Sequence, residues 1–166
     1  MVNILVVDDD RLILEVFTRI LASAQVETHC ASSGEEALEK MKQRTFSLMI
    51  TDLDMPGLDG LELSRRGHEL APHMPIIMDT GGISPEIIRR AQEIGIAKVI
   101  SKPFLPHEML AAIRDLMGDR WELPSSTGQA PGRSPSEETS SDNFSRWDQS
   151  SEVGGIRRIS KSRGFY

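Results

Sequence analysis

The sequence predicts an α/β fold in which helices cover both faces of a parallel sheet. Five short apolar runs alternate along the chain with five segments in which apolar residues recur at helical spacing. The apolar runs are continuous, which is typical of strands buried on both faces of a parallel sheet. For five strands in strict alternation with helices, the commonest arrangement is the flavodoxin-like, doubly wound sheet with strand order 2-1-3-4-5.

The first strand and helix lie at the start of the chain. Residues Ile4–Val7 form an apolar run that stops at three consecutive aspartates, Asp8–Asp10. Apolar residues then recur between Leu12 and Leu21, which places one apolar stripe on a helix of about three turns. A buried strand followed by an amphipathic helix is therefore the first unit of the fold.

The same unit repeats four times. Two helix starts carry capping signals, because Ser33 precedes Glu36 by three residues and Ser84 precedes a proline at the first helical position. The further predicted strands are Val26–Cys30, Ser47–Thr51, Ile76–Met78 and Ala97–Ser101. The further predicted helices start after Ser33, span Leu61–Leu70, start after Ser84, and run from Pro106 with an apolar stripe that ends at Met117.

The composition changes after Gly118. Residues 124–155 are rich in Ser, Pro, Gly, Thr and Glu and show no apolar periodicity, which is typical of disorder. We therefore expect one domain over residues 1–118 and a disordered tail over residues 119–166. Trp121, Phe144 and Trp147 are the exceptions in the tail and are candidates for docking, whereas its last stretch, Ile156–Tyr166, is a small basic tip that we expect to be solvated.

The acidic excess of the chain lies in the predicted domain. Residues 1–117 hold 18 Asp and Glu against 12 Lys and Arg, whereas residues 118–166 hold seven of each sign. Nucleic acids are bound by clustered basic residues, so we expect no nucleic-acid partner. The single cysteine, Cys30, excludes an internal disulfide. The chain shows no basic leader and no long apolar stretch, so we expect no secretory signal, no membrane span and a cytoplasmic location.

Polar residues gather at the predicted carboxyl ends of four strands. In an open α/β sheet the functional site lies outside these ends, where the strand order reverses. The residues concerned are Asp8, Asp9 and Asp10 after the first strand, Asp52 and Asp54 after the third, Asp79 and Thr80 at the end of the fourth, and Lys102 after the fifth. Crowded carboxylates repel one another, and a divalent cation would offset this repulsion.

The chemistry of this set favours phosphoryl acceptance. Mg²⁺ prefers oxygen ligands and keeps coordination positions open for phosphate oxygens, and Asp8 and Asp9 would supply metal contacts. Asp52 is the candidate nucleophile that would form an aspartyl phosphate. The Lys102 ammonium and the Thr80 hydroxyl would then offset charge on the phosphoryl oxygens.

Four segments resemble the signature of response-regulator receiver domains, and the resemblance covers residues 2–117. These segments are Val7-Asp8-Asp9, Thr51 to Gly60, Thr80-Gly81 and Lys102-Pro103-Phe104. The resemblance implies an acidic metal-binding pair (Asp8, Asp9), a phosphorylated aspartate that also contacts the metal (Asp52), a metal-binding backbone carbonyl (Asp54), a switch hydroxyl (Thr80) and an invariant lysine (Lys102) before a cis bond to Pro103.

The resemblance also implies the cofactor and the partners. Mg²⁺ is the cofactor, and a sensor histidine kinase or a phosphotransfer protein is the phosphodonor. Such a domain accepts a phosphoryl group on itself and is not a turnover enzyme. No output domain is recognisable after residue 117, so we expect signalling by phosphorylation-dependent contacts with a downstream protein.

Three positions depart from the family pattern. Val99 stands where an aromatic residue is usual, Asp79 replaces an apolar strand residue, and Leu105 replaces a polar helix cap. Two alternatives follow from the sequence. The Asp52-Leu-Asp54 motif also resembles that of haloacid-dehalogenase-type phosphatases, although those enzymes usually carry it on the first strand. Alternatively, the chain is a receiver-fold interaction module that is not phosphorylated.

Overall fold

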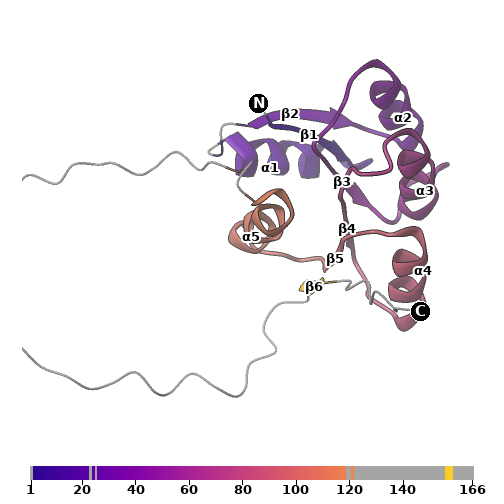
Figure 1. Cartoon of the computed structure of the whole chain (residues 1–166). Coiled ribbons are helices and arrows are strands. Elements are labelled where there is room, and N and C mark those ends of the chain that lie inside the picture. The colour runs from indigo at the N-terminus through magenta and orange to yellow at the C-terminus, as the bar shows by residue number, and fades with distance from the viewer. Residues whose placement is uncertain (1, 23, 25, 119–120, 122–155, 159–166) are drawn as a thin grey trace, which may run out of the picture.

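The computed structural model describes residues 2–22, 24, 26–118, 121 and 156–158. Five strands and five helices alternate as predicted (Figure 1). The strands are β1 (Val2–Val7), β2 (Val26–Ala31), β3 (Leu48–Asp52), β4 (Ile76–Thr80) and β5 (Lys98–Ser101). The helices are α1 (Arg11–Ala22), α2 (Gly34–Gln43), α3 (Gly60–Leu70), α4 (Pro85–Ile94) and α5 (Pro106–Met117).

The predicted flavodoxin-like order 2-1-3-4-5 is confirmed, and all neighbouring pairs among these five strands are parallel. A sixth strand, β6 (Ile156–Arg158), pairs antiparallel with β5 at the edge of the sheet. The sequence did not predict this strand and assigned irregular structure to these three residues. The rest of the predicted disordered tail, with Phe144 and Trp147, lies outside the described residues.

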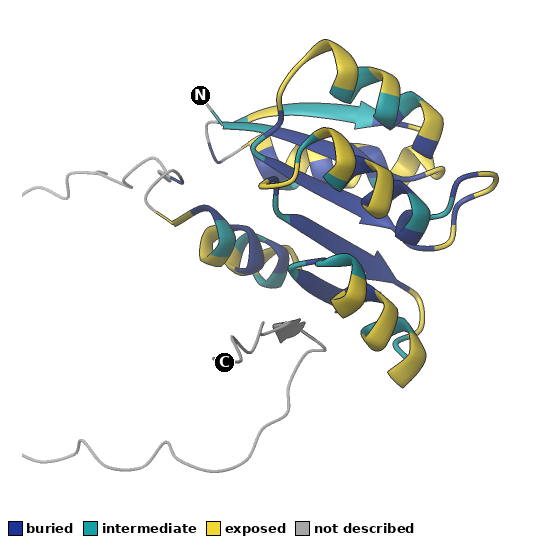
Figure 2. Cartoon of the chain, turned by 45° about the vertical axis from the view of Figure 1, so that its right-hand side comes forward, coloured by how far each residue is buried: buried dark blue, intermediate teal, exposed yellow. Residues whose placement is uncertain are grey.

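The sheet separates two apolar layers. Helices α1 and α5 cover one face, and α2, α3 and α4 cover the other (Figure 1). Strands β3 and β4 are fully buried and β1 and β5 mostly so, whereas the edge strand β2 is largely half-buried and the helices turn their exposed residues outward (Figure 2). This arrangement agrees with the continuous apolar runs in the sequence, because a strand covered by helices on both faces needs apolar residues at successive positions.

The helix caps predicted from the sequence are confirmed. The hydroxyl of Ser33 accepts a hydrogen bond from the Glu36 N–H at 3.2 Å, and that of Ser84 accepts one from the Ile87 N–H at 3.2 Å. Helix α4 ends at Gly95, whose φ of 92° lies in the left-handed region that glycine adopts at low cost. These local signals fix where α2 and α4 begin and where α4 ends.

Trp121 extends the core beyond the predicted domain boundary at residue 118. Its side chain is only 6% exposed and packs into the apolar layer under α1 and α5. Its backbone N–H donates to the carbonyl of Gly118 at 3.0 Å. Apolar area removed from water stabilises a fold, so the structural unit includes this tryptophan.

We expect the Trp121→Ala substitution to lower the unfolding free energy by about 3 kcal/mol, near the lower end for large aromatic residues in cores. The indole Nε1 has no hydrogen-bond partner among the described residues, which argues against a larger value. Thermal denaturation should show a fall of roughly 10 °C. A truncation after Gly118 should show the same loss, whereas one after Glu122 should not. Equal melting temperatures for the two truncations would contradict the role of Trp121.

Candidate functional site

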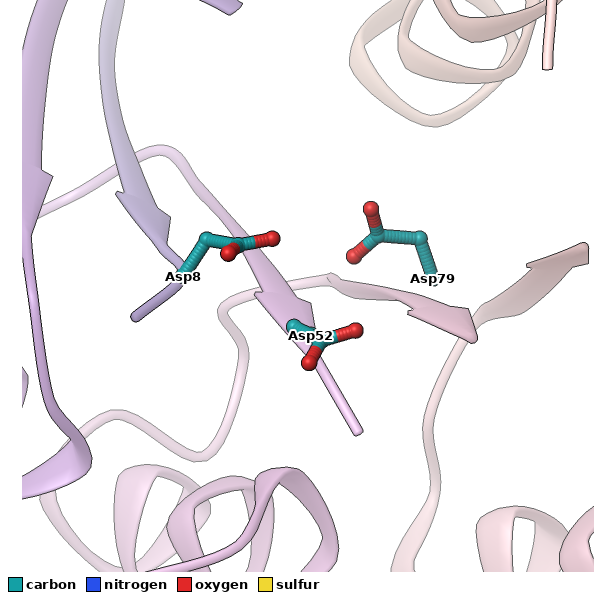
Figure 3. A group of neighbouring side chains, drawn as sticks. All are labelled: Asp8, Asp52 and Asp79. Atoms are coloured by element: carbon teal, nitrogen blue, oxygen red, sulfur yellow. The ribbon is translucent and has the colours of Figure 1, made fainter. Parts of the chain in front are cut away.

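The sheet brings three aspartates together at the carboxyl ends of β1, β3 and β4. Asp8 directly follows β1, and Asp52 and Asp79 are partners in the parallel register of β3 and β4. Register partners point to the same face of a sheet, so the two side chains lie side by side. Figure 3 shows the three carboxylates turned toward one another. An oxygen of each lies within 4.8 Å of the other two, and we call these three residues the carboxylate cluster.

The ammonium of Lys102 lies among these carboxylates. Its Nζ donates to Asp52 Oδ1 at 2.8 Å and to Asp8 Oδ2 at 3.0 Å. The distance from Nζ to Asp79 Oδ2 is 3.6 Å, which is an ion pair without a hydrogen bond. The predicted convergence of Asp8, Asp52 and Lys102 from three different strands is therefore confirmed in the structure.

Burial dominates the electrostatics of the cluster. It raises the pKa of Asp8, although the Asp10 N–H and Lys102 act against the increase. It raises the pKa of Asp79 to about 7, because this carboxylate is almost completely removed from water. Burial alone would lower the pKa of Lys102, but the charge of Asp79 and the hydrogen bonds to Asp52 and Asp8 outweigh it and raise the pKa.

Asp79 was expected at the end of the fourth strand, beside the predicted site, but the sequence analysis gave it no role there and noted it as a departure from the family pattern. Its side chain is 1% exposed, and its Oδ2 has no hydrogen-bond partner among the described residues. A signal was present in the sequence, since an acidic residue follows the apolar run Ile76–Met78 and stands directly before Thr80. Sequence spacing alone did not show that its carboxylate would face Asp52.

The loop between β3 and α3 restrains both the side chain and the backbone of Asp52. The Asp54 N–H donates to Asp52 Oδ2 at 3.1 Å, so both carboxylate oxygens of Asp52 are bound. Gly60, at the start of α3, packs so closely that a Cβ there would lie 2.1 Å from the Asp52 carbonyl oxygen. Asp59 caps the same helix by accepting from the Glu62 N–H at 2.8 Å. The loop therefore requires glycine at position 60.

Thr80 is close to the cluster but binds elsewhere. Its hydroxyl donates to the Gly82 carbonyl and accepts from the Gly82 N–H, each at 3.2 Å. A Cβ added at Gly81 or Gly82 would meet no atom within 4 Å, so the chain beside Thr80 leaves open space. The Lys102 N–H donates to the Thr80 carbonyl at 2.7 Å, which ties the ends of β4 and β5 together.

The remaining predicted residues lie at the rim. Asp9 and Asp54 are exposed and line a hollow beside the β3–α3 loop. Asp9 is not part of the carboxylate cluster, and its predicted role as a metal ligand stays a prediction. The peptide bond between Lys102 and Pro103 is cis, as the resemblance implies. Val99 is fully buried in the layer under α2, α3 and α4.

The donor set suits a hard divalent cation. Every candidate ligand is an oxygen atom, as Mg²⁺ prefers. The cluster holds three carboxylates against one ammonium, and one carboxylate oxygen, Asp79 Oδ2, lacks a hydrogen-bond donor among the described residues. A dication near these oxygens would offset the excess negative charge. The residues present therefore fit Mg²⁺.

Comparisons with known proteins identify a family of similar sequences. The family model for the response regulator receiver domain matches residues 4–114. The chain is 31% identical to the response regulator receiver protein CpdR of Brucella abortus, over 70% of this chain and 98% of that protein. It is 32% identical to the heme response regulator HssR of Staphylococcus epidermidis over 70% of this chain, which is 52% of that longer protein.

Solved structures show the same fold. The chemotaxis protein CheY4 of Vibrio cholerae superposes with a TM-score of 0.67 at 30% identity, covering 70% of this chain and 98% of that one. A CheY-like receiver domain protein of Methanospirillum hungatei gives a TM-score of 0.67 at 34% identity, covering 69% and 92%. Within the part of the chain that the structure describes, no helix has the length and apolar character needed to cross a membrane.

Proposed function

The chain belongs to the response regulator receiver domain family, whose members accept a phosphoryl group in two-component signalling, and we propose that Asp52 is the acceptor in this chain. One observation carries the proposal. Asp52 ends the central strand β3, and its two carboxylate oxygens are held by the Lys102 ammonium and the Asp54 N–H. A carboxylate fixed in this way is oriented for attack on phosphorus.

The reaction transfers a phosphoryl group from a phosphohistidine to Asp52. A carboxylate oxygen of Asp52 forms a bond to phosphorus while the bond from phosphorus to the histidine nitrogen breaks, and the bonding electrons stay on that nitrogen. Negative charge on the phosphoryl oxygens is then met by the Lys102 ammonium, which already lies 2.8 Å from Asp52 Oδ1. The protein therefore contributes by positioning the Asp52 carboxylate and by offsetting the negative charge of the phosphoryl oxygens.

We propose that Asp8, Asp9, Asp52 and the backbone carbonyl of Asp54 hold Mg²⁺. When bound, the cation offsets negative charge on the phosphoryl oxygens. The acidic cluster and its all-oxygen donor set support this assignment. Asp9 and Asp54 lie at the rim beside Asp52, where they are exposed.

Thr80 is the proposed switch residue. Its hydroxyl binds the Gly82 backbone, and a phosphoryl group on Asp52 would offer an alternative acceptor. A change of partner at Thr80 would move the Gly81-Gly82 segment, which has open space around it. Because Val99 replaces the usual aromatic residue, this switch would act without an aromatic side chain at position 99. The output is contact with a downstream protein.

The two alternatives from the sequence gain no support here. The Asp52-Leu-Asp54 motif follows the third strand, whereas phosphatases of the haloacid-dehalogenase type usually carry it on the first. Receiver domains are signalling domains rather than turnover enzymes, and the family match covers residues 4–114. An unphosphorylated interaction module would leave the hydrogen-bonded arrangement around Asp52 without a purpose.

We propose that the phosphodonor, a sensor histidine kinase or a phosphotransfer protein, docks on the start of α1 and of α5. Large apolar side chains are exposed on the first half of α1 and at the N-cap of α5, with Leu12 68%, Val16 45% and Leu105 56% exposed. Helix α1 follows Asp8–Asp10, and Leu105 follows Lys102 by three residues. The rings of Phe17 and Phe104 lie 5.6 Å apart and join the two elements. An apolar patch beside an acceptor suits a protein donor.

We expect the Leu12→Glu substitution to slow phosphotransfer from the cognate kinase by about tenfold or more, because a charge would enter the apolar contact. Labelling by acetyl phosphate needs no docking and should stay within about twofold. The cognate kinase would first be found by a phosphotransfer profile against purified sensor kinases. The matched control is Leu70→Glu, since Leu70 is 48% exposed on α3. Equal losses for both donors would show that Leu12 does not serve docking.

A further inference from the structure

Asp79 is the member of the carboxylate cluster that the proposed chemistry does not use. It is the register partner of Asp52 on β4 and is 1% exposed. Its Oδ2 has no hydrogen-bond partner among the described residues, and it lies 3.6 Å from Lys102 Nζ. A buried carboxylate oxygen without a hydrogen-bond donor costs free energy, so the presence of this carboxylate needs an explanation in the chemistry of the pocket.

Lys102 is the group for which the members of the cluster compete. Its ammonium has three donors and is shared by Asp8, Asp52 and Asp79. The same ammonium must meet the phosphoryl oxygens when Asp52 is phosphorylated. A negative charge at Asp79 therefore acts twice against the phosphoryl group, because it attracts Lys102 and repels the phosphoryl oxygens at short range.

We propose that Asp79 is a positioning residue that holds the Lys102 ammonium in the unphosphorylated pocket and opposes a phosphoryl group on Asp52. The inference rests on the proposed roles of Asp52 and Lys102. It adds a residue that sets how readily this chain takes and keeps its phosphoryl group. The side chain acts through Lys102 and through its own charge, and it does not itself react.

The proposal predicts opposite effects on two ligands. Removal of the Asp79 charge frees Lys102 and ends the repulsion, so a phosphoryl analogue should bind more tightly. The same removal takes one negative charge from the pocket, so Mg²⁺ alone should bind more weakly. If Asp79 had a merely structural role, its substitution would weaken the binding of both ligands, because a distorted pocket fits neither of them.

The test measures two affinities by isothermal titration calorimetry, both at the same pH. The first titration uses Mg²⁺ alone, and the second uses beryllofluoride at saturating Mg²⁺. For Asp79→Asn we expect beryllofluoride to bind about tenfold more tightly. We expect Mg²⁺ alone to bind more weakly, by about threefold or a larger factor. Asp79→Leu is the second variant, since it removes the charge without leaving an amide to be satisfied.

Asp59→Asn removes one charge outside the cluster and keeps a capping side chain, so both affinities should stay within about twofold. If the unsubstituted chain binds beryllofluoride but neither Asp79 variant binds it more tightly, the inference about Asp79 is overturned and the proposed function stands. If the unsubstituted chain binds no beryllofluoride in the presence of Mg²⁺, the roles of Asp52 and Lys102 fail and the inference fails with them.

Discussion

The Asp52→Asn variant is expected to take up no phosphoryl group from acetyl phosphate and Mg²⁺, whereas the unsubstituted chain is labelled once. The amide cannot replace the carboxylate as a nucleophile, and of the two cluster carboxylates that are held by Lys102 and a backbone N–H, Asp8 and Asp52, only Asp52 ends the central strand β3. Intact-mass spectrometry shows the labelling directly. The reaction should also stop when EDTA removes the cation, because the crowded carboxylates repel an anionic donor.

Asp54→Asn is the matched control for this experiment. Asp54 contributes its backbone N–H to Asp52 and, by our proposal, its carbonyl to Mg²⁺, so its side chain should be dispensable for labelling. Persistent labelling of Asp52→Asn, or labelling that is indifferent to EDTA, would refute the mechanism. A complete lack of labelling in the unsubstituted chain would instead favour the interaction module that is not phosphorylated.

The second large effect is expected at Gly60. An alanine Cβ would lie 2.1 Å from the Asp52 carbonyl oxygen, which is far inside van der Waals contact, so the backbone of the acceptor or of α3 must move. We expect Gly60→Ala to lower the unfolding free energy by about 3 kcal/mol or more, despite the better helix propensity of alanine. Thermal denaturation should show a fall of roughly 10 °C. Labelling at Asp52 should also slow, because the shift reaches the acceptor itself.

Gly81→Ala provides the control for the loss of a glycine. A Cβ at position 81 would meet no atom within 4 Å, so the melting temperature should change by only about 1–2 °C. If Gly60→Ala is as stable as this control, the close approach of α3 to β3 does not restrain the Asp52 backbone. The comparison therefore separates the packing requirement from the general entropic effect of replacing glycine.

Much of the site followed from local sequence, because it depends on where strands end. Asp8, Asp52 and Lys102 were predicted to meet, since the carboxyl ends of parallel strands share one edge of the sheet, and the structure confirms the contacts. Thr80 was predicted at the same edge, but its actual hydrogen bonds to Gly82 depend on the path of the chain after β4. Such short-range geometry has no periodic signal in a sequence.

The amino-acid sequence by itself determined the five parallel strands, their order, the helix caps and the chemistry of the strand ends, because these depend on apolar periodicity and local hydrogen bonds. The tertiary structure decided where the Asp79 and Asp9 side chains lie relative to Asp52 and that Trp121 is buried. Asp79 faces Asp52 because the two are register partners, Asp9 points to the rim, and Trp121 is buried under α1 and α5. Each of these outcomes depends on contacts between segments distant in the chain, which local patterns do not encode.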